Sequence, residues 1–484
     1  MTQAKHGNSE DEQPGEGEHG GKRVNRGEGN PSPTGDVGMA MNLPARAAEL
    51  IAKFERREAR VGVVGLGYVG LPLVRAMHAA GFEVVGYDVD AKKIEDLKAG
   101  RAYLKHLGEQ LVRDLAASPR FMPTADPKEL GTCDAVVLCV PTPLDAHEQP
   151  DLSYVIASTK MVASVITPGT LVSLESTSYP GTTREVCGEI LTRAGFVGDT
   201  SVYLVFSPER EDPGREGIDT STIPRVVGGV DPVSTRVGVA LYSAAVAKVI
   251  AVESAEVAEA AKLLENIYRA VNIALVNELK PVFADMGIDI WSVIKAAATK
   301  PFGFQPFYPG PGLGGHCIPI DPFYLTYKAR EFGHRTRFIE LAGEINSTMP
   351  RLVVEKVGLA LNDEEKSLRG ARVLVMGIAY KKDIDDVRET PAAEIATRLI
   401  ELGARVSYHD PHVPTFPSMR KYRLGLESVE LDEARVREAD CVLIVTDHTR
   451  VDYEMIGRCA KLVVDTRDAM ARVRGPMMAR VVKA

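Results

Sequence analysis

The chain has 484 residues, which is too long for one hydrophobic core and predicts about three domains. Hydrophobic residues make up 45% and charged residues 26% of it, and no apolar run reaches the roughly 18 residues that a membrane helix needs. The net charge of −8 argues against nucleic acid as the main partner, because counterion release requires a basic face. We therefore expect a multidomain globular protein that neither spans a membrane nor binds nucleic acid.

The cysteines and the first residues bear on metal binding and on location. Six cysteines are scattered along the chain without C-x-x-C pairs, a spacing that fits neither a disulfide framework nor a zinc site. The chain opens without a basic segment followed by an apolar one, so we expect no secretion signal. These features predict a cytoplasmic protein without a bound metal.

The first half of the chain is predicted to begin with a tail and continue as a doubly wound domain. Residues 1–43 are polar, with almost nothing to bury, and are expected to be disordered. Residues 44–250 begin with an amphipathic helix and then alternate strand and helix, which is typical of a parallel sheet covered on both faces. The predicted strands are 60–64, 83–87, 135–140, 171–175 and 202–206, and the predicted helices are 71–80, 152–165 and 183–194.

The second half is predicted to contain a helical domain followed by a second sheet domain. Residues 254–286 form one long helical pattern with Ser254 as a plausible N-cap, within a central helical domain over 251–366. Alternation returns in residues 367–484, with strands at 372–376, 405–409, 441–446 and 461–465 and a helix at 391–402. The predicted fold class is therefore α/β, with two doubly wound Rossmann-like domains joined by a central helical domain with one long helix.

A glycine turn, G-L-G-Y-V-G, separates the first strand from its helix. Gly65 allows a tight turn, Gly67 lets the backbone approach a pyrophosphate, and Gly70 permits close packing of helix on strand. Asp88 ends the next strand, where a carboxylate bonds a ribose 2′-hydroxyl and repels a 2′-phosphate. The pattern predicts an NAD site; the alternative is a structural turn with Asp88 as a solvated strand end. The corresponding turn of the second sheet domain, residues 377–388, lacks these glycines and is expected to meet a different phosphate-bearing ligand.

A second unusual segment surrounds one cysteine. Residues 307–325 read F-Y-P-G-P-G-L-G-G-H-C-I-P-I-D-P-F-Y-L and present Cys317 in a loop rich in glycine and proline. Such a loop requires unusual backbone angles, which are costly unless the loop has a use. We interpret Cys317 as the functional residue that this loop presents, with an inert buried cysteine as the alternative, and the other five cysteines as inert buried residues.

At this point the sequence resembles the UDP-glucose/GDP-mannose dehydrogenase family, from Arg60 to about Arg474. The motifs that carry the resemblance are the glycine turn, C-V-P-T-P at 139–143, E-S-T-S-Y-P-G-T-T at 175–183, S-P-E-R at 207–210, E-A-A-K-L-L-E-N at 259–266, the cysteine loop and K-K-D-I-D-D-V-R-E at 381–389. The resemblance implies a four-electron oxidation of a sugar C6 alcohol to a carboxylate with two NAD. An aldehyde must first add a nucleophile before a second hydride can leave, so Cys317 would form a thiohemiacetal and then a thioester.

The resemblance also implies roles for the residues around Cys317. Lys262 and Asn266, one helical turn apart, match residues that stabilise the charged oxygen, and Asp321 matches an aspartate that transfers protons with this lysine. The alternative is an exposed lysine and an ordinary polar helix position. Glu209 matches a glutamate that assists thioester hydrolysis, and Thr142 a threonine that orders water. UDP-glucose dehydrogenases carry a second glutamate where this chain has Pro213, so hydrolysis would rest on Glu209 alone.

Further binding residues follow from the same resemblance. NAD contacts are expected from Gly65, Gly67, Tyr68, Val69, Gly70, Asp88, Lys93, Thr142 and Thr177. Contacts with the nucleotide sugar are expected from Glu209, Arg210, Lys262, Asn266, Gly314, Lys381 and Arg388. An arginine suits a pyrophosphate because its planar fork bonds two oxygens. The alternative for Lys381 and Arg388 is a salt-bridged surface pair beside Asp385 and Asp386.

Within the family, S-P-E-R and the cysteine loop are most similar to the branch that oxidises UDP-N-acetyl-D-glucosamine to UDP-N-acetyl-D-glucosaminuronate. UDP-N-acetyl-D-mannosamine and UDP-glucose are the alternative substrates. Two rival functions remain: a single-step hydroxyacid-type dehydrogenase, which has no use for Cys317, and a non-catalytic sensor of nucleotide sugars or NAD. The resemblance further implies a homodimer or higher homo-oligomer through the central helix, and a product that feeds a surface polysaccharide or glycan.

Overall fold

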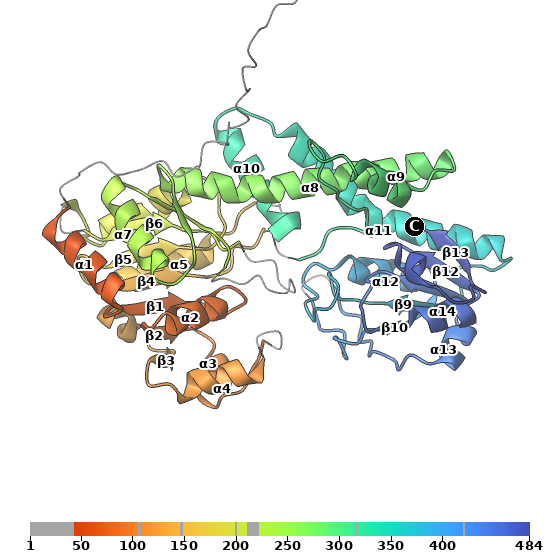
Figure 1. Cartoon of the computed structure of the whole chain (residues 1–484), viewed down its shortest axis with the longest axis horizontal. Helices are drawn as coiled ribbons and strands as arrows, with labels where there is room; N and C mark the ends of the chain where they lie inside the picture. Colours follow the sequence, from red (N-terminus) through yellow and green to blue (C-terminus); the bar gives the residue numbers. More distant parts are fainter. Residues whose placement is uncertain are drawn as a thin grey trace, which may run out of the picture.

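The structure is a computed structural model that describes residues 43–104, 108–145, 149–198, 201–210, 222–315, 317–419 and 422–484, with only the backbone of Cys317. The predicted tail lies outside the described residues apart from Leu43, as does Pro213. Two sheet domains stand side by side, and long helices run across one end of both (Figure 1). This arrangement confirms the predicted fold class.

The N-terminal domain is built on an eight-stranded sheet of order β3-β2-β1-β4-β5-β6-β7-β8. All neighbouring strands run parallel except β6 and β7, which are antiparallel. The strands are β1 (Arg60–Val64), β2 (Glu83–Tyr87), β3 (Phe121–Thr124), β4 (Ala135–Leu138), β5 (Leu171–Leu174), β6 (Tyr203–Phe206), β7 (Arg225–Gly229) and β8 (Val249–Ala251). The strands β3, β7 and β8 were not predicted. β3 contains a proline, β7 begins with an arginine and ends in two glycines, and β8 has three residues, so none of them carries an unbroken apolar run.

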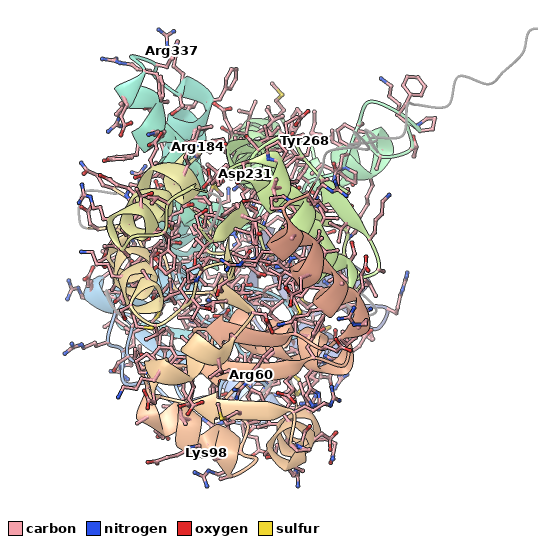
Figure 2. All side chains as sticks on the ribbon, turned by 90° about the vertical axis from the view of Figure 1, so that its left-hand side faces the viewer. Arg60, Lys98, Arg184, Asp231, Tyr268 and Arg337 are labelled. Atoms are coloured by element: carbon pink, nitrogen blue, oxygen red, sulfur yellow. The ribbon has the colours of Figure 1, made fainter. Side chains whose placement is uncertain are left out.

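Helices cover both faces of this sheet and bury two apolar clusters against it. They are α1 (Ala45–Arg56), α2 (Gly70–Ala79), α3 (Ala91–Lys98), α4 (Glu109–Ala117), α5 (Ser153–Ala163), α6 (Glu189–Arg193) and α7 (Pro232–Ser243). Figure 2 looks at this domain from its outer side, with Arg60 and Lys98 toward the end that lies away from the central helix carrying Tyr268. The predicted helix 183–194 proves to be a π-helical turn (Thr182–Gly188) followed by α6.

The central region consists of helices. The longest is α8 (Ala255–Asp285), and it packs against α10 and α11. Its N-cap is the predicted Ser254, whose side-chain oxygen accepts the Val257 N–H at 3.4 Å. The other central helices are α9 (Ile290–Ala297), α10 (Cys317–Glu331) and α11 (Arg337–Asp363). No helix in the described part of the chain is both long and apolar enough to cross a membrane.

The C-terminal domain holds a five-stranded parallel sheet of order β10-β9-β11-β12-β13. Its four predicted strands are present, and a fifth closes the edge. The strands are β9 (Arg372–Met376), β10 (Arg405–His409), β11 (Cys441–Ile444), β12 (Leu462–Asp465) and β13 (Arg480–Lys483), with helices α12 (Pro391–Glu401), α13 (Glu433–Glu438) and α14 (Tyr453–Cys459). In an open parallel sheet, ligands bind beyond the carboxyl ends of the strands, where the order reverses between β9 and β11.

Candidate active site

The glycine turn has the geometry that a dinucleotide requires. Gly65 has φ +92°, and a Cβ there would lie 2.7 Å from the Cys139 carbonyl oxygen. A Cβ on Gly70, the first residue of α2, would lie 1.8 Å from the Gly65 carbonyl oxygen. Nothing lies within 4 Å of the Cβ position of Gly67, so a phosphate has room to approach the backbone there. The residues of the turn fit the pyrophosphate of a bound NAD at the start of α2. Gly70, which makes the close contact with the Gly65 carbonyl, is the first residue of this helix.

Asp88 is not a solvated strand end, because only 5% of its surface is exposed. Its Oδ2 accepts the Leu66 N–H at 2.9 Å and a hydrogen bond from Lys93 Nζ at 3.0 Å. Asp88 therefore fixes the glycine turn from the end of β2, and Lys93 partly neutralises its charge. The predicted contact with the ribose stays a prediction.

Lys262, Asn266 and Asp321 meet in the core of the central region. Lys262 and Asn266 of α8 are each 7% exposed, which excludes the alternative of an exposed lysine. Asn266 Nδ2 donates to Asp321 Oδ2 at 2.6 Å, while Asp321 Oδ1 makes no hydrogen bond to any described residue. Burial raises the pKa of Asp321 to about 7, although Lys262 and Asn266 lower it. The cluster thus holds a carboxyl group that can exchange a proton near neutral pH.

The predicted nucleophile lies one helical turn before this carboxyl group. Cys317 is the first residue of α10 and Asp321 follows four residues later, so the two positions share a helix face. The Cys317 side chain lies outside the described residues. The preceding loop has two glycines in the left-handed region, Gly312 and Gly315, as its composition predicted. The other five cysteines are free and buried.

The cysteine loop is fastened to the C-terminal domain. The Gly315 N–H donates to the Arg388 carbonyl at 2.9 Å. A Cβ on Gly314 would lie 2.4 Å from Tyr380 Cβ, so only glycine fits at this contact. Gly314 therefore brings the loop against the C-terminal domain, and its predicted contact with the sugar nucleotide stays a prediction.

Thr142 joins the loop after β4 to the helix of the cysteine. Its hydroxyl donates to the Thr177 carbonyl at 2.8 Å, and its own carbonyl accepts the Tyr324 hydroxyl. Tyr324 is fully buried and lies three residues after Asp321, so Thr142 is held close to the same side of α10. The structure thus brings Thr142 near the Lys262, Asn266 and Asp321 cluster.

Glu209 lies over a buried ionic network. Arg225 of β7 is 4% exposed and pairs with Glu175 and, at 3.4 Å, with Glu209 Oε2. The Tyr242 hydroxyl donates to Glu175 Oε1 at 2.7 Å, and the Arg225 guanidinium stacks on the Tyr242 ring. Burial raises the pKa of Glu175 to about 7, although Arg225 lowers it. Arg225 therefore orients Glu209 and neutralises the carboxylate beneath it.

The predicted substrate-binding arginines already have protein partners. Arg210 pairs with Glu265 and donates to the Pro224 carbonyl at 2.8 Å. Arg388 pairs with Asp386, as in the alternative of a salt-bridged surface pair, but its guanidinium also stacks on the Tyr68 ring at 4.1 Å. The loop after β9 therefore contacts the glycine turn after β1. Lys381 is half-buried on the same loop.

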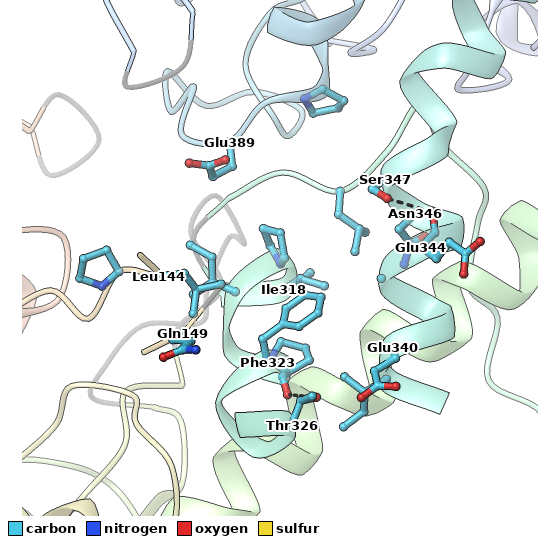
Figure 3. Close-up of a pocket in the computed structure, with 18 of the residues that line it drawn as sticks. Leu144, Gln149, Ile318, Phe323, Thr326, Glu340, Glu344, Asn346, Ser347 and Glu389 are labelled. Carbon is cyan, nitrogen blue, oxygen red and sulfur yellow. Dashed lines mark hydrogen bonds between the residues drawn. The ribbon is translucent and has the colours of Figure 1, made fainter. Parts of the chain in front are cut away.

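A pocket of about 920 Å³ lies beside α10 and α11 and reaches both sheet domains (Figure 3). The carboxylates among the described residues of its wall are Asp145, Glu340, Glu344, Glu389 and Glu394. Arg330 is the cation among the same residues. This acidic wall disfavours a pyrophosphate, and it does not include the Lys262, Asn266 and Asp321 cluster. The pocket and the cluster are neighbours on α10 rather than one space.

Sequence reasoning missed the network beneath Glu209. Glu175 was part of a recognised motif without an assigned role, and Arg225, Tyr242 and Tyr324 were not singled out. The sequence offered no specific signal for Arg225. It opens the run R-V-V-G-G just as Arg60, Arg372 and Arg405 open their own strands, and of these four arginines Arg225 is the buried one.

Comparison with known proteins finds one family in all three parts of the chain. Residues 59–246, 256–348 and 374–472 match the NAD binding, central and UDP binding domains of the UDP-glucose/GDP-mannose dehydrogenase family. The UDP-N-acetyl-D-glucosamine 6-dehydrogenase of Pseudomonas aeruginosa is 36% identical over 368 residues, or 76% of this chain and 86% of that protein. A UDP-N-acetyl-D-mannosamine dehydrogenase of Methanococcus maripaludis is 32% identical over 80% of this chain and 86% of its own length.

Solved structures agree with these matches. A UDP-D-ManNAc dehydrogenase from Pyrococcus horikoshii superposes with a TM-score of 0.78 at 30% identity, covering 88% of this chain and 98% of that one. NAD is accordingly the cofactor of the N-terminal domain, and a UDP-sugar is the class of substrate. The chain therefore belongs to the UDP-glucose/GDP-mannose dehydrogenase family of NAD-dependent oxidoreductases.

Proposed function

We propose that the protein oxidises the C6 alcohol of UDP-N-acetyl-D-glucosamine to the carboxylate, removing four electrons in two steps. The observation that carries this proposal is the buried cluster of Lys262, Asn266 and Asp321 one helical turn from Cys317. A single oxidation of an alcohol needs a base but no nucleophile. A cysteine beside the cluster is needed only when the aldehyde is oxidised further.

The residues of the cluster share two tasks in this proposal. NAD supplies the hydride acceptor for both oxidations. The Asp321 carboxylate accepts the proton of the C6 hydroxyl with Lys262 beside it, and the Asp321 pKa of about 7 suits a general base near neutral pH. The Cys317 thiolate then adds to the aldehyde to give a thiohemiacetal, and Lys262 and Asn266 stabilise the oxygen that gains charge. Loss of the second hydride leaves a thioester.

Hydrolysis of the thioester falls to Glu209 and Thr142. Glu209 is fixed by Arg225, and its carboxylate is suited to direct a water molecule at the thioester carbonyl. Thr142 is held next to α10. Its hydroxyl donates to the Thr177 carbonyl, and its oxygen would accept a hydrogen bond from that water molecule. The water adds, the Cys317 thiolate leaves, and the sugar carboxylate is released.

The cofactor and substrate are proposed to lie along the boundary between the two sheet domains. Gly65, Gly67, Tyr68, Val69 and Gly70 would hold the NAD pyrophosphate, with Asp88 and Lys93 near the ribose and Thr142 and Thr177 near the nicotinamide. Lys381 and Arg388 would bind the diphosphate of the UDP-sugar, and Arg210 and Gly314 would contact the rest of that molecule. The stacking of Arg388 on Tyr68 supports this arrangement, because it brings the two loops into contact.

The choice of sugar rests on likeness, and the relatives include enzymes named for both C2 epimers. The test is to incubate the protein with excess NAD and each of UDP-N-acetyl-D-glucosamine, UDP-N-acetyl-D-mannosamine and UDP-glucose, measuring NADH formed per sugar consumed. Two NADH per UDP-N-acetyl-D-glucosamine, with the highest kcat/KM of the three, is the expected result. One NADH per sugar would indicate the single-step dehydrogenase, and none with any sugar would indicate the sensor.

We also propose that the three domains span residues 44–250, 251–366 and 367–484. We further propose that α8 forms a homodimer interface. The support for a dimer is a row of exposed apolar side chains four or seven residues apart on one face of α8. They are Leu264, Tyr268, Leu275, Val282 and Met286. Light scattering of the purified chain should give twice the monomer mass, and Leu275→Glu should shift it toward the monomer.

A further inference from the structure

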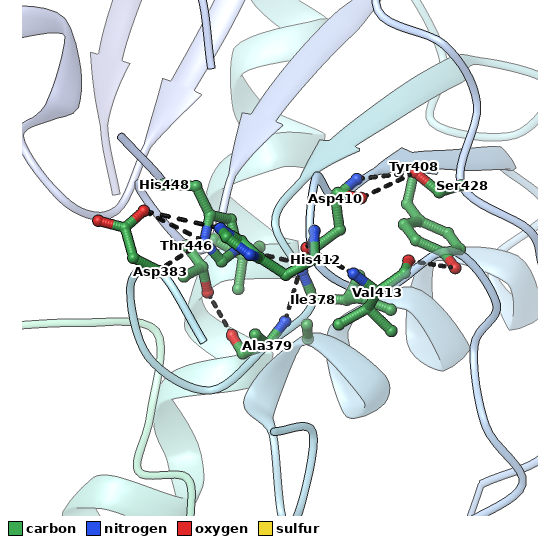
Figure 4. Close-up of polar contacts among 12 residues, drawn as sticks. Ile378, Ala379, Asp383, Tyr408, Asp410, His412, Val413, Ser428, Thr446 and His448 are labelled. Atoms are coloured by element: carbon green, nitrogen blue, oxygen red, sulfur yellow. Dashed lines mark hydrogen bonds and ion pairs between the residues drawn. The ribbon is translucent and has the colours of Figure 1, made fainter. Parts of the chain in front are cut away.

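A cluster of two histidines and two aspartates lies at the carboxyl ends of the strands in the C-terminal domain (Figure 4). Asp383 comes from the loop after β9, Asp410 and His412 follow β10, and His448 follows β11. In this position, beyond the strands where the sheet order reverses, open parallel sheets bind their ligands. Nothing in the proposed oxidation uses these four side chains.

The histidine at the centre of the cluster has its tautomer set by its surroundings. His448 is fully buried, and its Nε2 lies 3.0 Å from Asp410 Oδ2. Its Nδ1 accepts the Asp383 N–H at 3.0 Å, so the ring proton is on Nε2 and the Nδ1 lone pair points toward Asp383. A histidine that donates one ring N–H to a carboxylate and offers the other nitrogen is the usual arrangement of a metal ligand.

Asp410 is fixed in this arrangement by several hydrogen bonds. Its Oδ2 accepts the His448 Nε2–H at 3.0 Å, and its two carboxylate oxygens accept hydrogen bonds from backbone N–H groups. Those backbone groups belong to Ile378, Ala379, His412 and Val413. The carboxylate therefore holds the His448 ring rigidly in one orientation.

Two further atoms lie near Nδ1 of the His448 ring. His412 Nε2 lies 3.8 Å from Asp383 Oδ1, and His448 Nδ1 lies 3.9 Å from the same oxygen. His412 Nε2 is buried and makes no hydrogen bond to any described residue. The three atoms lie within 4.8 Å of one another, so a point equidistant from them is at most roughly 2.5 Å from each. A contraction of a few tenths of an ångström would reach the zinc distances of about 2.0–2.2 Å.

We propose that Asp383, His412 and His448 bind a divalent transition-metal cation of the zinc class, with Asp410 as the carboxylate that orients His448. Two imidazole nitrogens and one carboxylate oxygen suit Zn²⁺ or Co²⁺ and not Mg²⁺, which prefers oxygen ligands alone. Binding breaks the hydrogen bond from the Asp383 N–H to His448 Nδ1, whose lone pair then bonds to the cation, and the Asp383 carboxylate coordinates the same cation. This assignment differs from the sequence expectation of no metal, which considered cysteine spacing and could not see a site made from three separate loops.

The bound cation would fix the loop of residues 377–390. Asp383 is in this loop, between Lys381 and Arg388, and Thr449 already holds its carboxylate through the Thr449 N–H at 2.7 Å. Coordination would tie the loop to the ends of β10 and β11. The bound cation would therefore stabilise the loop of residues 377–390, which also contacts the glycine turn.

The test is a Co²⁺ titration of the full-length, untagged chain in a Cys317→Ser background, after removal of metal with a chelator. The substitution removes a thiol because thiolates are ligands for such cations, so a signal from Cys317 is excluded. We expect one Co²⁺ per chain, with visible absorption that lacks thiolate charge transfer and that Zn²⁺ abolishes by competition. His412→Ala and, separately, Asp410→Asn should weaken binding by about 10- to 100-fold. The matched control is His334→Ala, which removes an exposed histidine between α10 and α11 and should leave binding unchanged.

Circular dichroism and NAD affinity establish that each variant is folded, and Asp383→Asn serves as a second ligand variant if Asp410→Asn does not fold. Equal Co²⁺ affinity in the His412→Ala and His334→Ala proteins would overturn the proposal, because any bound metal would then be held elsewhere. A dissociation constant for Co²⁺ that is no tighter than millimolar in the Cys317→Ser chain would overturn the proposal as well. Both results are independent of whether the chain oxidises UDP-N-acetyl-D-glucosamine.

Discussion

Asp321→Asn would distinguish the cost of the buried Asp321 carboxyl to folding stability from its proposed use in catalysis. In the native protein burial raises the pKa of Asp321 from 3.8 to about 7. Between these values the folded state binds a proton that the unfolded state has lost, so the stability of the native protein falls as pH rises. Asparagine has the same shape and cannot ionise. It therefore removes this pH-dependent cost.

The size of the effect follows from the pKa. Each tenfold change in the acid dissociation constant corresponds to about 1.4 kcal/mol, so the full cost above pH 7 is about 4 kcal/mol. Between pH 5 and pH 8, Asp321→Asn should become more stabilising relative to the native chain by about 3 kcal/mol. Oxidation of the UDP-sugar at pH 8 should fall by at least about 100-fold, because a proton acceptor is lost.

The measurement is urea unfolding at the two pH values, followed by the fluorescence of the single tryptophan, Trp291 in α9. This residue reports on the central region that contains Asp321. Asp285→Asn, an exposed carboxylate at the end of α8, is the matched control and should show no such pH dependence. A stability difference between Asp321→Asn and the native chain that is equal at both pH values would refute the reasoning.

Three further predictions follow from other parts of the structure. Cys317→Ser should abolish uronate formation at or before the thioester stage, and chromatography of the sugar products that shows uronate at the native rate would remove the nucleophile assignment. Arg225→Met leaves Glu175 buried without its cation and should lower the free energy of unfolding by about 3–5 kcal/mol, measured by denaturant titration, with Glu175→Gln in the same chain recovering part of the loss. Gly70→Ala places a methyl group against the Gly65 carbonyl and should weaken NAD binding, measured by calorimetry, while the UDP-sugar still binds. An unchanged NAD affinity would contradict the close contact.

Much of the fold was readable in the sequence, because local periodicity and turn chemistry are local properties. The glycines of the turn, the N-cap Ser254 and the buried strands all lie within short windows of sequence. The strands β3, β7 and β8 escaped prediction because none of them carries an unbroken apolar run of its own. The π-helical turn Thr182–Gly188 escaped as well. At its start, Glu259 of α8 accepts the Gly181 and Thr183 N–H groups, a contact with a residue distant in the chain.

The site divides in the same way. The sequence by itself determined the cofactor turn and the shared helix face of Lys262 and Asn266, because each depends on residue type and spacing within one element. Only the tertiary structure decided that Asn266 donates to Asp321, that Arg225 lies under Glu209, and that Asp383, His412 and His448 converge. These contacts join residues up to tens of positions apart, and their electrostatics depend on burial, which raises the cost of every unpaired charge and which no local pattern reports.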